Sequence, residues 1–175
     1  MSPSQAYLKI QEQDQFWVKV LEKHSLEELN LKPSEDEWSL GQLLNHLVFI
    51  NQTLVKQIEI CVEKKGIYDT NNLKLGTRLI LYFNRLPPLK YKVPKIIDKI
   101  PAQPTNKEEL AQKFKNNLIA AASLAEKVKS ADPHYKVMHP SMGALSAKGW
   151  LQFMSIHMKH HQRQYTRLKA FIARN

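Results

Sequence analysis

The placement of proline most constrains the fold of this chain. All 9 prolines fall at positions 3, 33, 87, 88, 94, 101, 104, 133 and 140, which leaves four long stretches without one. Proline breaks a helix interior because it lacks a backbone N–H and its ring clashes with the preceding turn. Each of the four stretches also repeats its apolar residues at the spacing of one helix face. The pattern predicts four long amphipathic helices.

The first two predicted helices differ in how clearly their ends are marked. The first runs from about residue 4 to 29, and its apolar stripe consists of Tyr7, Ile10, Trp17 and Leu21. The second begins at Ser39, an N-cap with Gln42 three positions later as a capping box. It continues to Lys65, where Gly66 supplies a stop. Its stripe consists of Leu43, Leu47, Ile50, Leu54, Ile58 and Cys61.

The third and fourth predicted helices follow the proline-rich middle of the chain. After Pro104, Thr105 and Glu108 form another capping box, and the third helix runs to about Ala131. Its stripe consists of Leu110, Phe114, Leu118, Ala121, Ala125 and Val128. The fourth helix opens at Ser146 and runs almost to the C-terminus.

Four amphipathic helices bury their stripes against one another, and a four-helix bundle is the economical arrangement. We therefore expect one all-α domain over residues 1–175, and no strand-type alternation competes with this prediction. The segment from Gly66 to Pro104 is too long for a turn between bundle helices. We expect a short helix within Leu73–Leu86, followed by an extended crossover along the surface. A crossover of this length lets the second and third helices run parallel.

The charge balance leaves two classes of partner open. The chain carries 26 Lys and Arg against 16 Asp and Glu, a formal net charge of +10. Such a balance permits binding to nucleic acid or to an acidic partner without demonstrating it. Most of the cations are lysines scattered through amphipathic segments, which is typical of solvated helix faces. A small-molecule substrate is therefore the expected partner. The alternative is a non-catalytic bundle whose basic surface binds an acidic partner or nucleic acid.

The expected location is the cytoplasm. A single cysteine excludes an intramolecular disulfide framework. No run approaches the roughly 18 consecutive apolar residues of a membrane-spanning helix. The first residues lack the basic and then apolar order of an export signal. We therefore expect no membrane partner.

The histidines are the residues that point to chemistry. Three of the 7 lie close together, at His157, His160 and His161. On a helix His157 and His161 differ by about 40° and one turn, so they can share a ligand. Both fall in the apolar stripe of the last helix, whereas His160 lies nearer its edge. The spacing and the placement together indicate two inward-facing imidazoles.

Buried imidazoles need a partner for their nitrogens. A divalent metal would satisfy both, because neutral imidazole binds Zn²⁺ and also suits Ni, Cu and Fe. Two ligands bind weakly, so a third is expected from another helix, and His46 on the flank of the second stripe is the candidate. The alternative is a hydrogen-bonded core cluster without metal. His24 and His134 are expected at the surface or in loops.

Two segments resemble DinB/YfiT-like proteins. One is WSLGQLLNHL at residues 38–47, and the other is residues 139–164 with the patterns HPxxGxLS, WL and HxxHHxxQ. The resemblance in helix plan covers nearly the whole chain. It implies a DinB-like four-helix bundle with a metal site formed by His46, His157 and His161. Zn²⁺ or Ni²⁺ is the implied metal, and homodimers are frequent in the family.

The resemblance implies a metal-dependent enzyme but leaves two reactions open. Hydrolysis by metal-acidified water normally needs a carboxylate base. Asp14 is the only acidic residue that can point inward, and we expect it at the edge of its helix, in solvent. Transfer to or from a low-molecular-weight thiol needs no protein base, because the metal itself lowers the thiol pKa. Cys61 is not that thiol, because it lies about 22 Å beyond His46 along the helix.

His139 is the expected catalytic residue. The loop over residues 139–143 precedes the last helix, so the imidazole can reach the open end of the metal site as a donor to a ligand or as a substrate contact. It can equally cap a helix or fill a surface notch. His160 is expected to orient a ligand or to pack at an interface. The aromatic residues expected in the core are Trp38, Trp150 and Tyr165.

Overall fold

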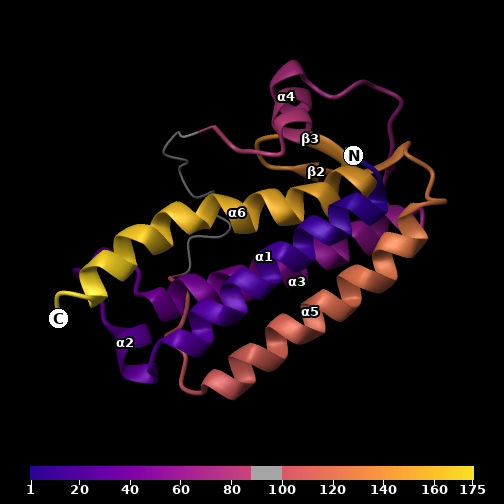
Figure 1. Ribbon diagram of the computed structural model, residues 1–175. Helices are drawn as coiled ribbons and strands as arrows, with labels where there is room; N and C mark the ends of the chain where they lie inside the picture. Colours follow the sequence, from indigo (N-terminus) through magenta and orange to yellow (C-terminus); the bar gives the residue numbers. More distant parts are fainter. Residues whose placement is uncertain (88–99) are drawn as a thin grey trace.

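Four long helices pack lengthwise in the computed structural model, which describes residues 1–87 and 100–175 (Figure 1). They are α1 (Pro3–Lys23), α3 (Leu40–Val62), α5 (Lys107–Val128) and α6 (Ala147–Ile172). α3 and α5 run in one direction and α1 and α6 in the other. Both α1 and α3 pack against α5 and α6. The predicted all-α bundle is confirmed, and its second and third long helices are parallel.

Side-chain caps begin the long helices. At the start of α3, Ser39 Oγ accepts the Gln42 backbone N–H at 3.1 Å, and Gln42 Oε1 accepts the Ser39 N–H at 3.0 Å. This predicted capping box is confirmed, as is Ser146 as the N-cap of α6. The predicted start of α5 is wrong by one residue. Its N-cap is Asn106, whose side chain accepts the Glu109 N–H at 2.8 Å.

The first predicted helix is two helices in the structure. α1 ends at Lys23, His24 is extended, and the short α2 (Leu26–Asn30) follows. The prediction of one helix to residue 29 is therefore wrong. The physical reason is a second capping box, in which Ser25 and Glu28 satisfy each other's backbone N–H groups. This box begins a new helix in a new direction.

α3 ends three residues before the predicted Lys65. Lys64 has a φ of 58°, so the left-handed residue that closes this end is not Gly66. Gly66 has a different role, because a Cβ there would overlap the Lys136 carbonyl oxygen. The glycine lets two backbone segments approach closely.

A small sheet covers one end of the bundle, although no strand-type alternation is visible in the sequence. Its strands are β1 (Ile67–Tyr68), β2 (Tyr135–His139) and β3 (Gly143–Ser146), antiparallel in that order. Strands this short carry too few residues for alternation to stand out in the sequence. β3 leads directly into α6, so the hairpin determines where that helix begins.

The connection between α3 and α5 contains the predicted short helix, α4 (Leu75–Phe83). Most of the predicted extended crossover, residues 88–99, lies outside the described residues. Its last part crosses the start of α3, where Gln42 Nε2 donates to the Pro101 carbonyl and Asn45 Nδ2 to the Ala102 carbonyl, each at 2.8 Å. Within the described ranges, no helix is long and apolar enough to cross a membrane.

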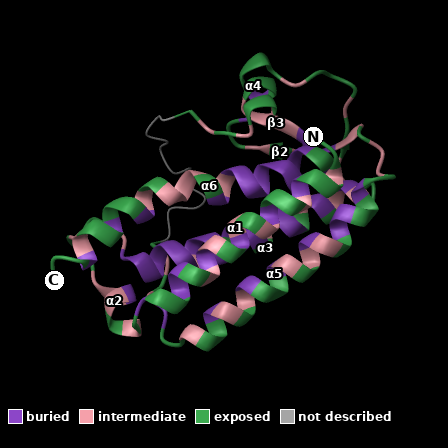
Figure 2. Cartoon of the chain, in the orientation of Figure 1, coloured by how far each residue is buried: buried purple, intermediate pink, exposed green. Residues whose placement is uncertain are grey.

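Buried residues lie on the sides of the helices that face one another (Figure 2). Their apolar side chains form two clusters along the bundle. The cluster near the sheet includes Ile10, Leu54, Ala121, Trp150 and Met154, and the other includes Trp17, Leu43, Phe114, Met158 and Tyr165. Trp150 and Tyr165 are buried as predicted, but Trp38 is only half-buried. Each long helix carries one buried polar residue near the point where it passes between the clusters. These residues are Asp14, Asn51, Asn117 and Ser155.

Candidate metal centre

Three histidines from two antiparallel helices meet beside the core. His46 lies on α3, and His157 and His161 lie one turn apart on α6. One ring nitrogen from each lies within 4.8 Å of the other two, so the group is able to hold a metal ion. The His46 ring centroid is 5.4 Å from that of His157 and 5.0 Å from that of His161. The structure thus brings together the three residues predicted as ligands.

Neighbouring side chains orient these rings. Gln164 Oε1 lies 3.1 Å from His161 Nδ1 and accepts its proton, because an amide oxygen cannot donate. The Nε2 lone pair of His161 is therefore directed at His157, whose Nε2 is 3.2 Å away. Trp38 packs against His46 with ring centroids 5.0 Å apart. Gln164 was part of the sequence pattern, but its contact with His161 is a tertiary observation.

Burial keeps all three imidazoles neutral. It lowers the pKa of His46 to about 4. Burial and the neighbouring His46 lower the pKa of His161 to about 3. The pKa of His157 lies well below its usual value because of burial and the surrounding histidines. At neutral pH these nitrogens hold lone pairs rather than protons that a metal would have to displace.

The separation of His157 Nε2 and His161 Nε2 is compatible both with a shared metal and with a hydrogen-bonded cluster. Two nitrogens, each about 2.0–2.1 Å from a tetrahedral zinc ion, lie about 3.3 Å from each other, close to the observed separation. The same distance permits a hydrogen bond from His157 to His161. That bond leaves out His46, which has no hydrogen-bond partner among the described residues, and His157 Nδ1 is buried without one. A shared cation would use one nitrogen from each of the three rings, His46 included, although a cation held at His157 Nε2 would leave Nδ1 of that ring without a partner.

His139 lies outside this group, at the end of β2. Its Nδ1 accepts the backbone N–H groups of Ser141 and Met142, both at 3.1 Å, so its proton sits on Nε2. The ring packs against Trp150 and Phe153, with centroids 5.3 and 4.8 Å away. Burial lowers the pKa of His139 to about 4. The imidazole thus holds the hairpin turn, and its catalytic role stays a prediction.

No carboxylate joins the histidines in the part of the chain that the structure describes. The expectation that Asp14 is in solvent is wrong, because its side chain is buried and burial raises its pKa to about 6. Asp14 is not in the histidine group either. Glu37 is connected to the histidine group through shared neighbours. It lines a hollow together with Trp38, which contacts His46, and Gln164, which contacts His161. Sequence reasoning missed Glu37. Its position directly before Trp38 was the only signal in the sequence, and the structure shows that it is exposed.

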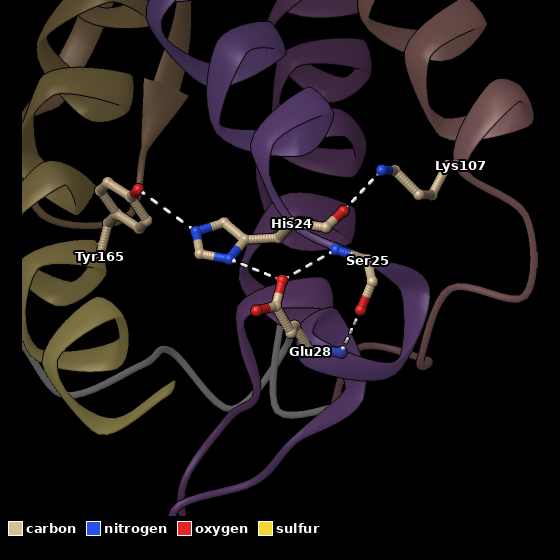
Figure 3. Close-up of polar contacts among 5 residues, drawn as sticks. All are labelled: His24, Ser25, Glu28, Lys107 and Tyr165. Carbon is tan, nitrogen blue, oxygen red and sulfur yellow. Dashed lines mark hydrogen bonds and ion pairs between the residues drawn. The ribbon is translucent and has the colours of Figure 1, made fainter. Parts of the chain in front are cut away.

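A second buried histidine corrects another expectation. His24, expected at the surface or in a loop, lies in the turn between α1 and α2 but is only 5% exposed (Figure 3). Its Nδ1 donates to Glu28 Oε2 at 3.2 Å, so its Nε2 accepts from the Tyr165 hydroxyl at 3.4 Å. Lys107 Nζ donates to the His24 carbonyl. This cluster attaches the corner to α5 and α6.

Comparisons with known proteins agree with the fold and add no reaction. The family model described as the DinB superfamily matches residues 10–165. The uncharacterized protein YuaE of Bacillus subtilis (strain 168) is 29% identical over 148 residues, which cover 85% of this chain and 87% of that protein. No solved structure gives a significant match.

Proposed function

This chain belongs to the DinB superfamily, and we propose that it is an enzyme that depends on a divalent metal held by His46, His157 and His161. One observation carries the proposal, namely the convergence of three neutral imidazoles whose ligand nitrogens lie within 4.8 Å of one another. Zn²⁺ or Ni²⁺ is the proposed metal, because both accept nitrogen ligands. Three uncharged ligands also leave the cation its full charge, which is typical of catalytic sites.

The surrounding residues have separate tasks in this proposal. When bound, the cation supplies a Lewis acid that lowers the pKa of a water molecule or a thiol. Gln164 holds His161 in one tautomer, and Trp38 shields one face of His46 from water. His139 carries its proton on Nε2, so it acts as a hydrogen-bond donor to a substrate oxygen rather than as a base.

The proposed reaction is S-transfer with a low-molecular-weight thiol. The thiol proton leaves to solvent, the thiolate electron pair forms a bond to an electrophilic carbon, and the bond to the leaving group breaks with its electron pair. This reaction needs no protein base. It is supported by the composition of the histidine group, which contains no carboxylate among the described residues.

Hydrolysis is the second candidate, and one observation favours it. Glu37 lines the hollow beside the histidines, so it is available as the base that hydrolysis normally requires. The Glu37→Gln variant separates the two reactions. We expect it to leave the thiol reaction rate within about twofold, whereas a hydrolase that uses Glu37 would slow by about a hundredfold or more. Rates with thiol acceptors and with activated esters measure the difference.

The metal itself is tested first by elemental analysis of tag-free protein. We expect about one Zn or Ni per chain in the wild type and almost none in His157→Ala. His134→Ala is the matched control, because His134 lies outside the histidine group, and it should keep its metal. Far-UV circular dichroism shows whether each variant is folded. Negligible metal in folded wild type, even after reconstitution, would contradict the proposal.

Two further predictions concern the setting of the enzyme. The homodimer implied by the family resemblance stays a prediction, which light scattering of the purified protein tests. The cytoplasmic location also stays a prediction, and fractionation of the source cells tests it.

A further inference from the structure

We propose that a cationic hollow next to the metal centre binds the anionic group of a small-molecule substrate. The inference rests on the proposed function and adds the chemical class of the substrate. Three cations line the hollow, Arg85 after α4 and Lys159 and Arg163 on α6. The remaining lining residues are Leu86, Ile156, His160 and Gln162. None of these side chains is acidic.

The convergence of the three cations is a product of the tertiary structure. Asn84 ends α4 with a φ of 49°, a left-handed turn that reverses the chain, and the Arg85 N–H donates to the Ile80 carbonyl at 3.2 Å. Gln152 Nε2 donates to the Leu81 carbonyl and so attaches this end of α4 to α6. Arg85 is thereby held over the helix that carries the other two cations.

The cations around the hollow repel one another, and a bound anion would remove this repulsion. Lys159 and Arg163 are four residues apart on α6, and like charges at this spacing destabilise a helix. Within residues 1–87 and 100–175, no ion pair involves either of them or Arg85. A hollow whose charged lining residues are all cations raises the local concentration of anions. The two arginines can also bind a carboxylate or phosphate in the bidentate manner.

The hollow is close enough to the histidines to serve them. His160 lines it, and its ring centroid lies 5.3 Å from that of His161. Ile156, which also lines the hollow, directly precedes His157 in α6. His160 therefore connects the hollow with the histidine group, and a molecule with its anionic group in the hollow reaches the metal centre past this side chain. The substrate, or the thiol that reacts with it, then carries a carboxylate or a phosphate.

Isothermal titration calorimetry at low ionic strength tests the site, with inorganic phosphate and succinate as separate probes. We expect saturable binding of at least one probe, and the stronger probe distinguishes the phosphate source from the carboxylate source. Arg163→Gln and Arg85→Gln should each weaken that binding about tenfold, the loss of one charge-assisted hydrogen bond. Lys169→Gln is the matched control, because it removes an exposed cation from the same helix outside the hollow. It should bind the probe as the wild type does.

The outcomes keep this inference separate from the proposed function. His46→Ala should lose the metal and still bind the probe, which shows that the anion is not bound to the metal. Arg163→Gln should keep its metal. No binding by the wild type, unchanged binding in both arginine variants, or equal weakening in Lys169→Gln would overturn the hollow as a site, whatever the metal content. Binding only to a duplex oligonucleotide would overturn it in favour of an extended nucleic-acid surface.

Discussion

Two buried histidine clusters in this bundle differ in how completely the protein satisfies them. His24 donates to Glu28 and accepts from Tyr165, so both of its ring nitrogens have protein partners (Figure 3). In the candidate metal centre, His157 Nδ1 is buried without a hydrogen-bond partner, and the bond between His157 and His161 does not include His46. A satisfied buried histidine holds the fold together, whereas an unsatisfied group with converging lone pairs favours a ligand. The difference supports the proposal that one cluster is structural and the other holds a ligand.

Removal of one histidine from each cluster gives the largest expected contrast. His46→Ala should abolish metal binding, because a divalent cation held by two imidazoles is weakly bound. His24→Ala should leave the metal bound and lower the free energy of unfolding by about 2 kcal/mol, since it leaves Glu28 and Tyr165 without their partner. Metal analysis and urea denaturation of the metal-free forms measure the two effects. Metal loss in His24→Ala would contradict the distinction.

Substitution of Gln164 should have a smaller effect, and only on metal binding by the candidate metal centre. Gln164→Leu removes the acceptor that orients His161, and metal affinity should fall about 10- to 100-fold. Competition with a chromophoric chelator measures this change. Gln162→Leu is the control on the same helix, because Gln162 bonds to Gln13 instead of a histidine. Equal losses in both variants would point to a general perturbation of α6.

Asp14 extends the comparison to an acid that lacks a partner among the described residues. Burial raises its pKa from 3.8 to about 6, so the unfolded chain releases its proton first as the pH rises. The free energy of unfolding therefore falls by about 2–3 kcal/mol as the pH rises from about 4 to 6. Asp14→Asn should be more stable than the wild type by about that amount at pH 7 and equal at pH 4. Urea titrations at both pH values check this, and equal stability of the two proteins at pH 7 would contradict it.

Tyr165→Phe should have the smallest effect, and it tests the hydrogen bond between Tyr165 and His24 in the structural cluster. It removes the hydroxyl that donates to His24 Nε2 and keeps the aromatic packing against Trp17, which has a centroid distance of 6.0 Å. The free energy of unfolding should fall by about 1 kcal/mol, with metal content unchanged. In the His24→Ala background the same change should have almost no effect. An undiminished loss there would mean that Tyr165 acts independently of His24.

Local signals in the sequence predicted much of the fold. Helix periodicity between prolines located the four long helices, and Ser39 and Ser146 marked two of their starts correctly. The errors occurred where two local signals compete. Ser25 caps a new helix where the apolar pattern predicted that the first helix continues. Asn106 rather than Thr105 is the N-cap of α5, so the predicted start was wrong by one residue. The strands were missed because β2 and β3 are stabilised by pairing with each other, which no single segment reveals.

The candidate site was predictable to the extent that it depends on one helix face. His157 and His161 share such a face, and the flank position of His46 identified the second helix. The satisfied state of His24 was not predictable, because Tyr165 lies 141 residues away in the sequence. The burial of Asp14 was equally hidden, since an acidic residue near a stripe is usually solvated.

The sequence by itself determined the helices, most of their caps and the histidine pair on α6, because these depend on residues at most four positions apart. Only the tertiary structure decided that His46 completes the group and that His24 does not need a ligand. It also decided that Arg85 joins Lys159 and Arg163 around one hollow. The physical reason is the same in each case. Partners on separate helices are selected by how the helices pack, and packing depends on the buried surfaces of the whole bundle.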